Sequence, residues 1–155
     1  LACPASPKYY LNKPLDTAMA STVGVLNVLN FVKKNRKTVM LHSSTSEVYG
    51  SAQFVPMSED HPLNPQSPYA ASKIASDSLA ISYHKSFNLP IIVARPFNTY
   101  GPRQSLRAVI PTIISQIMSK TKKIKLGATD TLRDFTYVKD TARGLIEISK
   151  SNKRR

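Results

Sequence analysis

The stretch KTVMLHSSTSEVYG, residues 37–50, decides the fold. Its apolar first part, 37–42, predicts a short buried strand. Polar side chains follow at once, namely Ser43, Ser44, Thr45, Ser46, Glu47 and Tyr49. A turn accounts for serine, which bonds its own backbone, but accounts less well for a glutamate and a tyrosine around Val48. The loop after this strand therefore needs an explanation beyond chain reversal.

Helical and extended patterns alternate along the rest of the chain. An apolar stripe predicts a helix at 16–34, with Asp16 as its cap. A second helix is predicted at 67–87, with Ser67 as cap and Pro68 in the first turn. Further helices are predicted at 108–120 and 139–150, strands at 90–96 and 123–127, and an extended segment at 134–138. This alternation predicts an α/β fold with a parallel sheet and flanking helices.

The composition is that of one soluble globular domain. A chain of 155 residues that is 41% hydrophobic can bury a core. No apolar run approaches the ~20 residues of a membrane span, and LACPASPKYY at the start lacks the regions of a secretory signal. The single cysteine, Cys3, cannot form an internal disulfide and is expected to be a packing residue. We therefore expect a cytoplasmic protein without a membrane partner.

The net charge of +13 raises the question of nucleic-acid binding. The basic clusters at 33–37, 120–125 and 150–155 are scattered over predicted helix ends and strand entries, where cations suit the helix dipole. The chain has no aromatic-interleaved basic strand and no zinc-finger spacing. Nucleic-acid binding and a metal site are therefore not predicted, whereas an anionic small-molecule substrate would suit the charge.

Tyr69 and Lys73 are four residues apart in the second predicted helix, so they share one face. An ammonium beside the phenol would lower the tyrosine pKa from its ordinary value of about 10. Such a tyrosine can act as a general base near neutral pH. A lone YxxxK, however, is more often two neighbours on a half-exposed helix, so the pair needs support from other motifs.

That support comes from four motifs in order: SSTSEVYG (43–50), SPYAASK (67–73), RPFNTYGPRQ (95–104) and RDFTYVKD (133–140). The first and third leave the carboxyl ends of strands, where ligands of open parallel sheets bind. Together the motifs resemble the extended short-chain dehydrogenase/reductase family of nucleotide-sugar epimerases and dehydratases. The resemblance implies a Rossmann fold, bound NAD, and a substrate that is a sugar linked to a nucleoside diphosphate.

The resemblance also implies a role for each matching residue. Tyr69 would take the proton from the sugar O4, Thr45 would orient O4, and Lys73 would bond the nicotinamide ribose. The implied substrate contacts are Asn98, Arg107 and Arg133, the last as a guanidinium fork on the pyrophosphate. The implied cofactor contacts are Ala2, Ser44, Tyr69, Lys73 and Pro96.

Glu47 indicates the branch of the family. Epimerases need only the hydroxyl, the tyrosine and the lysine, whereas a carboxylate just before VYG resembles the 4,6-dehydratases. There the glutamate removes the C5 proton after oxidation at C4. The dTDP-glucose dehydratases have an aspartate as acid where this chain has Ser46. Glu47 itself or a water held by Ser46 is therefore the candidate acid for the leaving hydroxyl.

Several alternatives stay open. The segments 95–114 and 131–144 resemble UDP-N-acetylglucosamine 4,6-dehydratase-like enzymes of the legionaminic-acid type, and LACPASPKYY resembles UDP-glucuronate decarboxylase. The longer resemblance favours a 4,6-dehydratase over a decarboxylase or a 4-epimerase. A non-catalytic fragment that keeps the motifs as packing is the alternative from another class. Neither the nucleotide nor the sugar follows from the sequence.

The domain organisation follows from what the motifs cover. The glycine-rich turn of the first βαβ unit has no counterpart among the 155 residues, which contain only five glycines. We therefore expect 1–105 to form the second half of an NAD-binding Rossmann domain, and 106–155 to begin an interleaved substrate-binding lobe. Related enzymes also imply a homodimer through helices 16–34 and 67–87, with Val25, Leu29, Leu79 and Ile81 as apolar surface.

Overall fold

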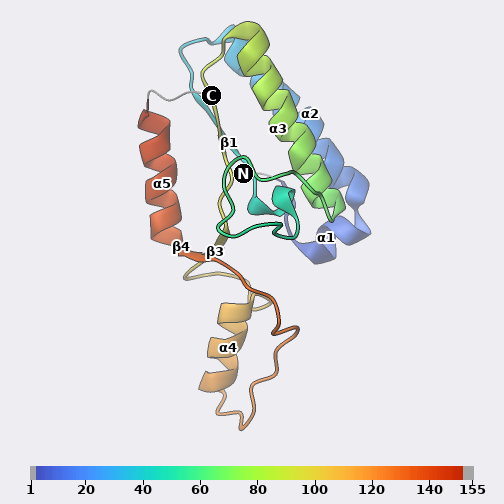
Figure 1. Cartoon of the computed structure of the whole chain (residues 1–155), viewed down its shortest axis with the longest axis vertical. Coiled ribbons are helices and arrows are strands. Elements are labelled where there is room, and N and C mark those ends of the chain that lie inside the picture. The colour runs from blue at the N-terminus through green and yellow to red at the C-terminus, as the bar shows by residue number, and fades with distance from the viewer. Residues whose placement is uncertain (1–2, 152–155) are drawn as a thin grey trace. The chain divides into compact units, whose positions relative to one another are not determined.

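The computed structural model describes residues 3–151 and contains both helices and parallel strands (Figure 1). The elements are α1 (Pro7–Asn12), α2 (Pro14–Lys34), β1 (Met40–Ser43), the one-turn 3₁₀ helix η1 (Ser46–Tyr49), α3 (Pro68–Phe87), β2 (Ile91–Ala94), β3 (Asn98–Tyr100), α4 (Val109–Met118), β4 (Phe135–Tyr137) and α5 (Val138–Lys150). The chain forms two compact units: residues up to Pro96 together with those from Gly144 onward, and Phe97–Arg143. The assignment of 1–105 to a cofactor domain and 106–155 to a substrate lobe stays a prediction.

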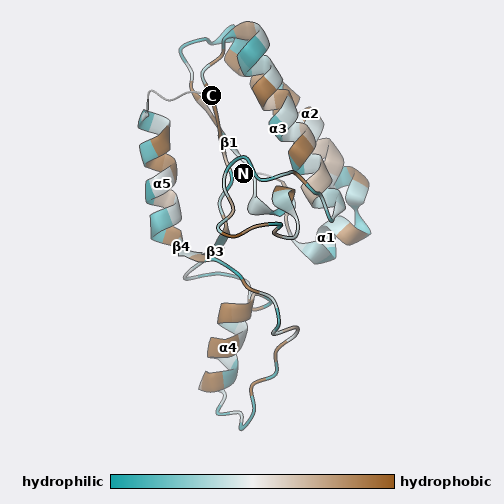
Figure 2. Ribbon diagram, viewed as in Figure 1, coloured by the Kyte–Doolittle hydropathy of each residue, from teal (hydrophilic) through white to brown (hydrophobic). Residues whose placement is uncertain are grey.

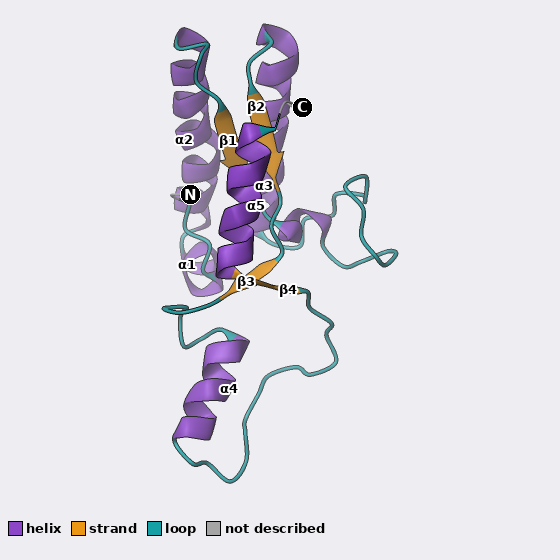
Figure 3. Ribbon diagram, turned by 90° about the vertical axis from the view of Figure 1, so that its left-hand side faces the viewer, coloured by secondary structure: helices purple, strands orange, loops and turns teal. Residues whose placement is uncertain are grey.

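The first unit is organised around two parallel strands. β1 pairs with β2 in a register that runs from Met40 opposite Ile91 to Ser43 opposite Ala94 (Figure 3). The parallel pairing predicted from the alternating pattern is therefore confirmed. Both strands begin later than predicted, at 40 instead of 37 and at 91 instead of 90.

The core of this unit lies where α2 and α3 pack together and against the strands (Figures 1 and 3). Its buried members are Leu29, Val32, Met40, Ala80, Leu89 and Ile91. Leu29 and Ile91 are fully buried at 0% exposure. The prediction that Leu29 lies on a dimer surface is therefore wrong, because its side chain fills the core of its own chain.

The starts of α2 and α3 show how well local signals set a helix boundary. α3 begins at Pro68, and the Ser67 side chain accepts a hydrogen bond from Ala70 N at 3.0 Å, as predicted. α2 begins two residues before its predicted cap, because Pro14 suits the first helical position. Asp16 instead lies in the first turn, where its charge still complements the helix dipole.

In the second unit, β3 and β4 pair in parallel, with Asn98 opposite Phe135. The strand predicted at 123–127 does not form. A strand needs a partner for its backbone, and here the Gln116 side chain takes that place. Its amide nitrogen donates to Lys125 O and its amide oxygen accepts from Lys125 N, both at 2.8 Å.

Helices α2 and α4 each expose several large apolar side chains. α4 has no buried residue, and Figure 2 shows it largely in the hydrophobic colour. Within residues 3–151, α2 alone is long and apolar enough to cross a membrane, with 21 residues and a mean hydropathy of 1.3. The expectation that no apolar stretch reaches that length is therefore wrong. The core helix of a soluble protein passes the same test, and α2 buries Leu29 and Val32.

We predict that Leu29→Ala lowers the free energy of unfolding by about 2–5 kcal/mol, because the cavity it leaves is enclosed by packed core side chains. Leu11→Ala, in the neighbouring helix α1 at 65% exposure, is the matched control and should change the stability by less than about 0.5 kcal/mol. Denaturant unfolding of the purified chain measures both. Equal losses in the two variants would contradict the assignment of Leu29 to the core.

Candidate functional site

The loop that follows β1, residues 44–50, forms a short turn. Thr45 caps η1, because its Oγ1 accepts a hydrogen bond from Glu47 N at 3.2 Å. Gly50 ends η1 with a positive φ of 63°, and a Cβ there would collide with the Asn64 carbonyl oxygen. The turn buries Val48 and Tyr49 and leaves Glu47 exposed. Glu47 is therefore the exposed residue of this stretch, whereas its neighbours Val48 and Tyr49 belong to the interior.

The same turn is fastened to the end of β2. Ser44 N donates to Ala94 O at 2.7 Å, and Ser46 N donates to Pro96 O at 3.1 Å. These bonds continue the parallel pairing of the two strands past their ends. The predicted site residues Thr45, Ser46 and Glu47 therefore lie beside Pro96, as expected for two strand ends at one edge of a sheet.

Tyr69 and Lys73 lie on the buried side of α3, with 7% and 6% exposure. Lys73 Nζ donates to Ser43 O at 2.6 Å, so the ammonium lies at the end of β1. Burial lowers the pKa of Lys73. The Tyr69 ring stacks on Tyr10 of α1, with ring centroids 5.5 Å apart. The two residues are therefore more than neighbours on a half-exposed helix.

Burial and the nearby charge of Glu47 raise the pKa of Tyr69 to about 12, although a hydrogen bond with the Thr45 side chain opposes them. The polypeptide by itself therefore does not show the lowered pKa expected for this tyrosine, and the role of Lys73 in lowering it stays a prediction. The reason is that the phenol is withdrawn from water while a carboxylate stands near it. A hydrogen bond with Thr45 and the charge of Glu47 both act on the Tyr69 phenol, so we group these three residues as one cluster.

Below this cluster lies a buried polar network that the sequence reasoning missed. Asp77 is 1% exposed, and its Oδ2 accepts hydrogen bonds from Ser44 Oγ and Arg95 Nε, each at 2.9 Å. Its Oδ1 lies 3.2 Å from His42 Nε2 without hydrogen-bond geometry. Burial alone would raise the pKa of Asp77, but contacts with His42, Ser44 and Arg95 lower it. The sequence did contain one signal for Asp77. It lies four residues after Lys73, just as Lys73 lies four residues after Tyr69.

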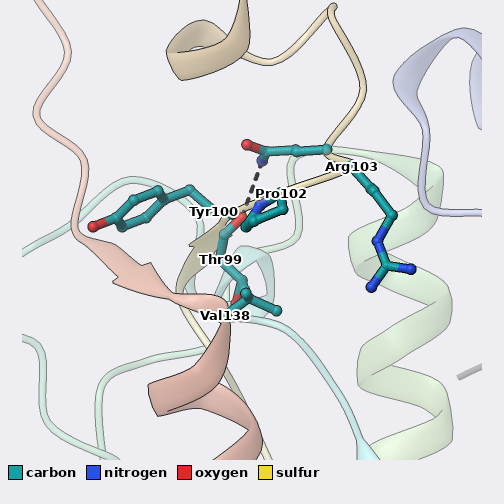
Figure 4. A pocket seen from close by; sticks show the side chains of 7 residues that line it. Thr99, Tyr100, Pro102, Arg103 and Val138 are labelled. Carbon is teal, nitrogen blue, oxygen red and sulfur yellow. Dashed lines mark hydrogen bonds between the residues drawn. The ribbon is translucent and has the colours of Figure 1, made fainter.

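Asn98, Arg107 and Arg133 all belong to the second unit and are exposed. Asn98 begins β3 opposite Phe135, and Arg133 lies two residues before Phe135 in the chain. A pocket of about 220 Å³ in this unit is lined by residues 99–104 and Val138 (Figure 4). Gln104 Nε2 donates to Thr99 O across it, at 3.0 Å.

The remaining predicted contacts are as follows. Ala2 lies outside the described residues. Ser44 is buried, with its hydroxyl donating to Asp77 and its N–H donating to Ala94 O, so both of its donors are used within the protein.

Cys3 Sγ lies 2.9 Å from Ser21 Oγ. Among residues 3–151, no group of three His, Cys, Asp or Glu side chains could hold a metal ion.

Comparison with known proteins gives a consistent result. A family model described as GDP-mannose 4,6 dehydratase matches residues 1–155. The chain is 34% identical over 159 residues to UDP-glucuronic acid decarboxylase 1 of Xenopus tropicalis, covering 98% of this chain and 38% of that protein. The resemblance to a decarboxylase is thus not confined to the first ten residues. The chain spans well under half the length of this relative.

Two solved structures show the same arrangement. UDP-N-acetylglucosamine 4-epimerase from Methanobrevibacter ruminantium, in complex with UDP-N-acetylmuramic acid, matches with a TM-score of 0.91 and 33% identity, over 99% of this chain and 51% of that one. dTDP-glucose 4,6-dehydratase from Bacillus anthracis, in complex with NAD, matches with a TM-score of 0.84 and 30% identity, over 92% of this chain and 46% of that one. Both similarities support the Rossmann-like fold that the sequence predicts.

The raised pKa of Tyr69 predicts an alkaline loss of stability. The folded state keeps the phenol proton up to about pH 12, whereas the unfolded state releases it near pH 10. The stabilisation is therefore complete below pH 10 and is lost as the pH rises towards 12. Denaturant unfolding across this range should show a smaller decline for Tyr69→Phe than for the wild type. In Glu47→Gln the decline should also begin near pH 10 but end at a lower pH and be smaller, because a charge that raises the folded-state pKa is gone. Identical pH dependence in all three proteins would contradict the assignment.

Proposed function

The chain belongs to the GDP-mannose 4,6-dehydratase family, and on that premise we propose that it carries the catalytic residues of an NAD-dependent nucleotide-sugar 4,6-dehydratase. The observation that carries the proposal is the placement of Glu47. Its carboxylate lies at the exposed start of η1, and its charge raises the pKa of the Tyr69 phenol. A second acid–base group beside the tyrosine is what a dehydratase needs and an epimerase does not.

The residues of the site fit the nicotinamide half of NAD. The Lys73 ammonium has three donors, and one of them bonds Ser43 O. The others can serve a ribose hydroxyl and the phenol oxygen. Bound NAD would accept the hydride from the sugar C4 and return it to C6. We propose further cofactor contacts at Ala2, Ser44 and Pro96, with Ser44 restricted to its acceptor atoms because both of its donors are used.

The first chemical step is proton removal from the hydroxyl at C4. Tyr69 takes this proton as C4 becomes a carbonyl carbon, and Thr45 orients O4 through its hydroxyl. Since the Tyr69 pKa is about 12 in the polypeptide, assembly of the complete site must lower it. A cation beside the phenol favours the phenolate, and Lys73 is the group placed to supply it.

The second step is loss of water across C5 and C6. The carbonyl at C4 acidifies the C5 proton, and Glu47 removes it. The C6 hydroxyl leaves as water after it accepts a proton from Glu47 or from a water held by Ser46. Hydride addition at C6 and return of a proton to C5 then give the 4-keto-6-deoxy sugar. Glu47 is exposed, as a group that must reach a bound sugar has to be.

The proposed substrate is a sugar linked to a nucleoside diphosphate. Asn98, Arg107 and Arg133 would contact its diphosphate and nucleotide, for which guanidinium groups are suited. The three side chains are exposed in the second unit and accessible to such a ligand. We also propose a cytoplasmic location, where NAD and nucleotide sugars are both present.

A UDP-glucuronate decarboxylase is the second candidate. The similarity to the Xenopus tropicalis enzyme over 98% of this chain favours it. In that reaction, oxidation at C4 gives a β-keto acid, which loses carbon dioxide without removal of a C5 proton. Thr45, Tyr69 and Lys73 would have the same roles, whereas Glu47 would not be needed as the C5 base.

We predict that Glu47→Gln separates oxidation from elimination in the complete gene product. C4 oxidation should persist, because it needs Thr45, Tyr69 and Lys73 only. The amide cannot remove the C5 proton, so reduced cofactor should accumulate without 4-keto-6-deoxy product. The near-ultraviolet absorbance of the cofactor and product chromatography measure the two steps, with UDP-N-acetylglucosamine, dTDP-glucose and UDP-glucuronate as substrates.

Tyr69→Phe is the control for this experiment. It should lower the rate of cofactor reduction itself by about 10²–10⁴-fold. A decarboxylase would still release carbon dioxide from UDP-glucuronate in the Glu47→Gln variant, and an epimerase would be largely unaffected. Undiminished 6-deoxy product from Glu47→Gln would rule out the mechanism proposed here.

We further propose that the protein forms a homodimer through α2 and α3. Outside its core contacts, α2 exposes apolar side chains along its length: Leu15, Met19, Val23, Val28 and Phe31. Val25 and Leu79 are partly buried against the core. An exposed apolar face of this length indicates an interface.

A homodimer through this face predicts that charge on it breaks the assembly. Val23→Glu, at a position 42% exposed, should convert the dimer to a monomer without unfolding it. Light scattering at tens of micromolar, with circular dichroism as the folding check, measures this. Thr121→Glu, an exposed position in the second unit, is the control. A folded wild-type monomer at this concentration would contradict the proposal.

A further inference from the structure

Asp77 is the one acidic side chain of α3, and the mechanism above does not use it. It lies four residues beyond Lys73 and eight beyond Tyr69, on the same buried side of the helix. A carboxylate that is 1% exposed needs partners, because burying an unpaired charge is costly. Its partners come from segments that carry the other site residues.

Two of these partners stand at the ends of the paired strands. Ser44, which directly follows β1, donates its hydroxyl proton to Asp77 Oδ2 at 2.9 Å. Arg95, which directly follows β2, donates from Nε to the same oxygen at 2.9 Å. His42 in β1 lies 3.2 Å from Oδ1. Asp77 therefore connects α3 to the ends of both strands.

Arg95 extends this connection to the turn that bears Glu47. Its Nη1 donates to Tyr49 Oη at 3.0 Å, and its guanidinium carbon lies 5.3 Å from the centre of the Tyr49 ring. Tyr49 is the last residue of η1, two residues after Glu47. A chain of contacts thus runs from the helix of Tyr69 and Lys73 through Asp77 and Arg95 to the turn of Glu47.

We propose that Asp77, Arg95 and Tyr49 are positioning residues that hold the Glu47 turn in place against the helix bearing Tyr69 and Lys73. The inference rests on the proposed function only in taking Glu47 as the base of the elimination step. None of the three residues is proposed to touch the substrate.

The shortness of the turn supports this role. η1 has only four residues, and two backbone hydrogen bonds at its ends measure 3.4 Å (Val48 N to Thr45 O) and 3.2 Å (Gly50 N to Glu47 O). A turn of this kind depends on outside contacts for a fixed geometry. A buried ion pair adds little net stability compared with apolar packing, so its presence here is better explained by the geometry it fixes. Misplacement of a reacting group by about 1 Å can slow a reaction by about 10²-fold.

Tyr49→Phe in the complete gene product is the most direct test, because it removes one hydroxyl and keeps the buried ring. We expect 6-deoxy product to form about 10- to 100-fold more slowly while C4 oxidation is little changed, so reduced cofactor accumulates. Tyr83→Phe is the matched control, since Tyr83 packs on Phe87 away from the network.

The double variant with Glu47→Gln separates positioning from general destabilisation. If Tyr49 acts through Glu47, Tyr49→Phe should have no further effect on elimination once Glu47 is replaced. A loss that persists in the Glu47→Gln background, or an equal slowing of C4 oxidation, would overturn the proposal. Undiminished product from Tyr49→Phe would overturn it as well.

Amide hydrogen exchange tests the contact independently of the reaction. Peptides covering 44–50 should exchange faster in Tyr49→Phe than in the wild type or in Tyr83→Phe, and peptides from α3 should be unchanged. If the wild type gives no 6-deoxy product from any nucleotide sugar, the proposed function fails, and the exchange result alone decides the positioning role. Unchanged exchange at 44–50 would overturn that role whatever the enzyme does.

Discussion

The site depends on the parallel pairing of β1 with β2. The register that sets Ser43 opposite Ala94 brings the loops after both strands to one edge. The bonds from Ser44 N and Ser46 N to Ala94 O and Pro96 O carry this pairing past the strand ends. Because parallel strands end at the same edge, no other sheet arrangement would bring these two loops together. Side chains of the loops after β1 and β2 therefore lie close together, although they come from distant parts of the sequence.

The helix that covers these strands carries opposite charges on its buried side. Lys73 and Asp77 are both at most 6% exposed. Lys73 contacts the end of β1, whereas Asp77 contacts the residues that follow both strands. The ammonium bonds Ser43 O, and the carboxylate accepts from Ser44 Oγ and Arg95 Nε. Both charges are therefore compensated without pairing directly with each other. The remaining donors of Lys73 can bind a ligand. The carboxylate of Asp77 is used in connecting α3 to the ends of the two strands.

The relatives explain why the fold alone does not name the reaction. A decarboxylase, a 4-epimerase and a 4,6-dehydratase all resemble this chain at 30–34% identity. A hydroxyl, a tyrosine and a lysine suffice for oxidation at C4, which the three reactions share. What differs is the fate of the keto sugar. In the mechanism proposed for this chain, that fate depends on Glu47, which lies on a short turn.

The sequence by itself predicted the parallel strands and the boundaries of α3, because these depend on local patterns. The four motifs are likewise local features of the sequence. Ser67 supplies the cap and Pro68 the first position of α3, and both signals lie within the sequence of the helix start itself. Local pattern failed at 123–127, where the Gln116 side chain took the place of a strand partner.

The tertiary structure alone decided three features. Leu29 belongs to the core and not to a surface, because α3 and the strands pack over it. The pKa of Tyr69 is raised and not lowered, because burial and Glu47 outweigh the hydrogen bond with Thr45. Asp77 meets Arg95 across 18 positions of sequence. Burial and charge compensation depend on which segments meet in space, and the spacing of residues along one chain does not contain that information.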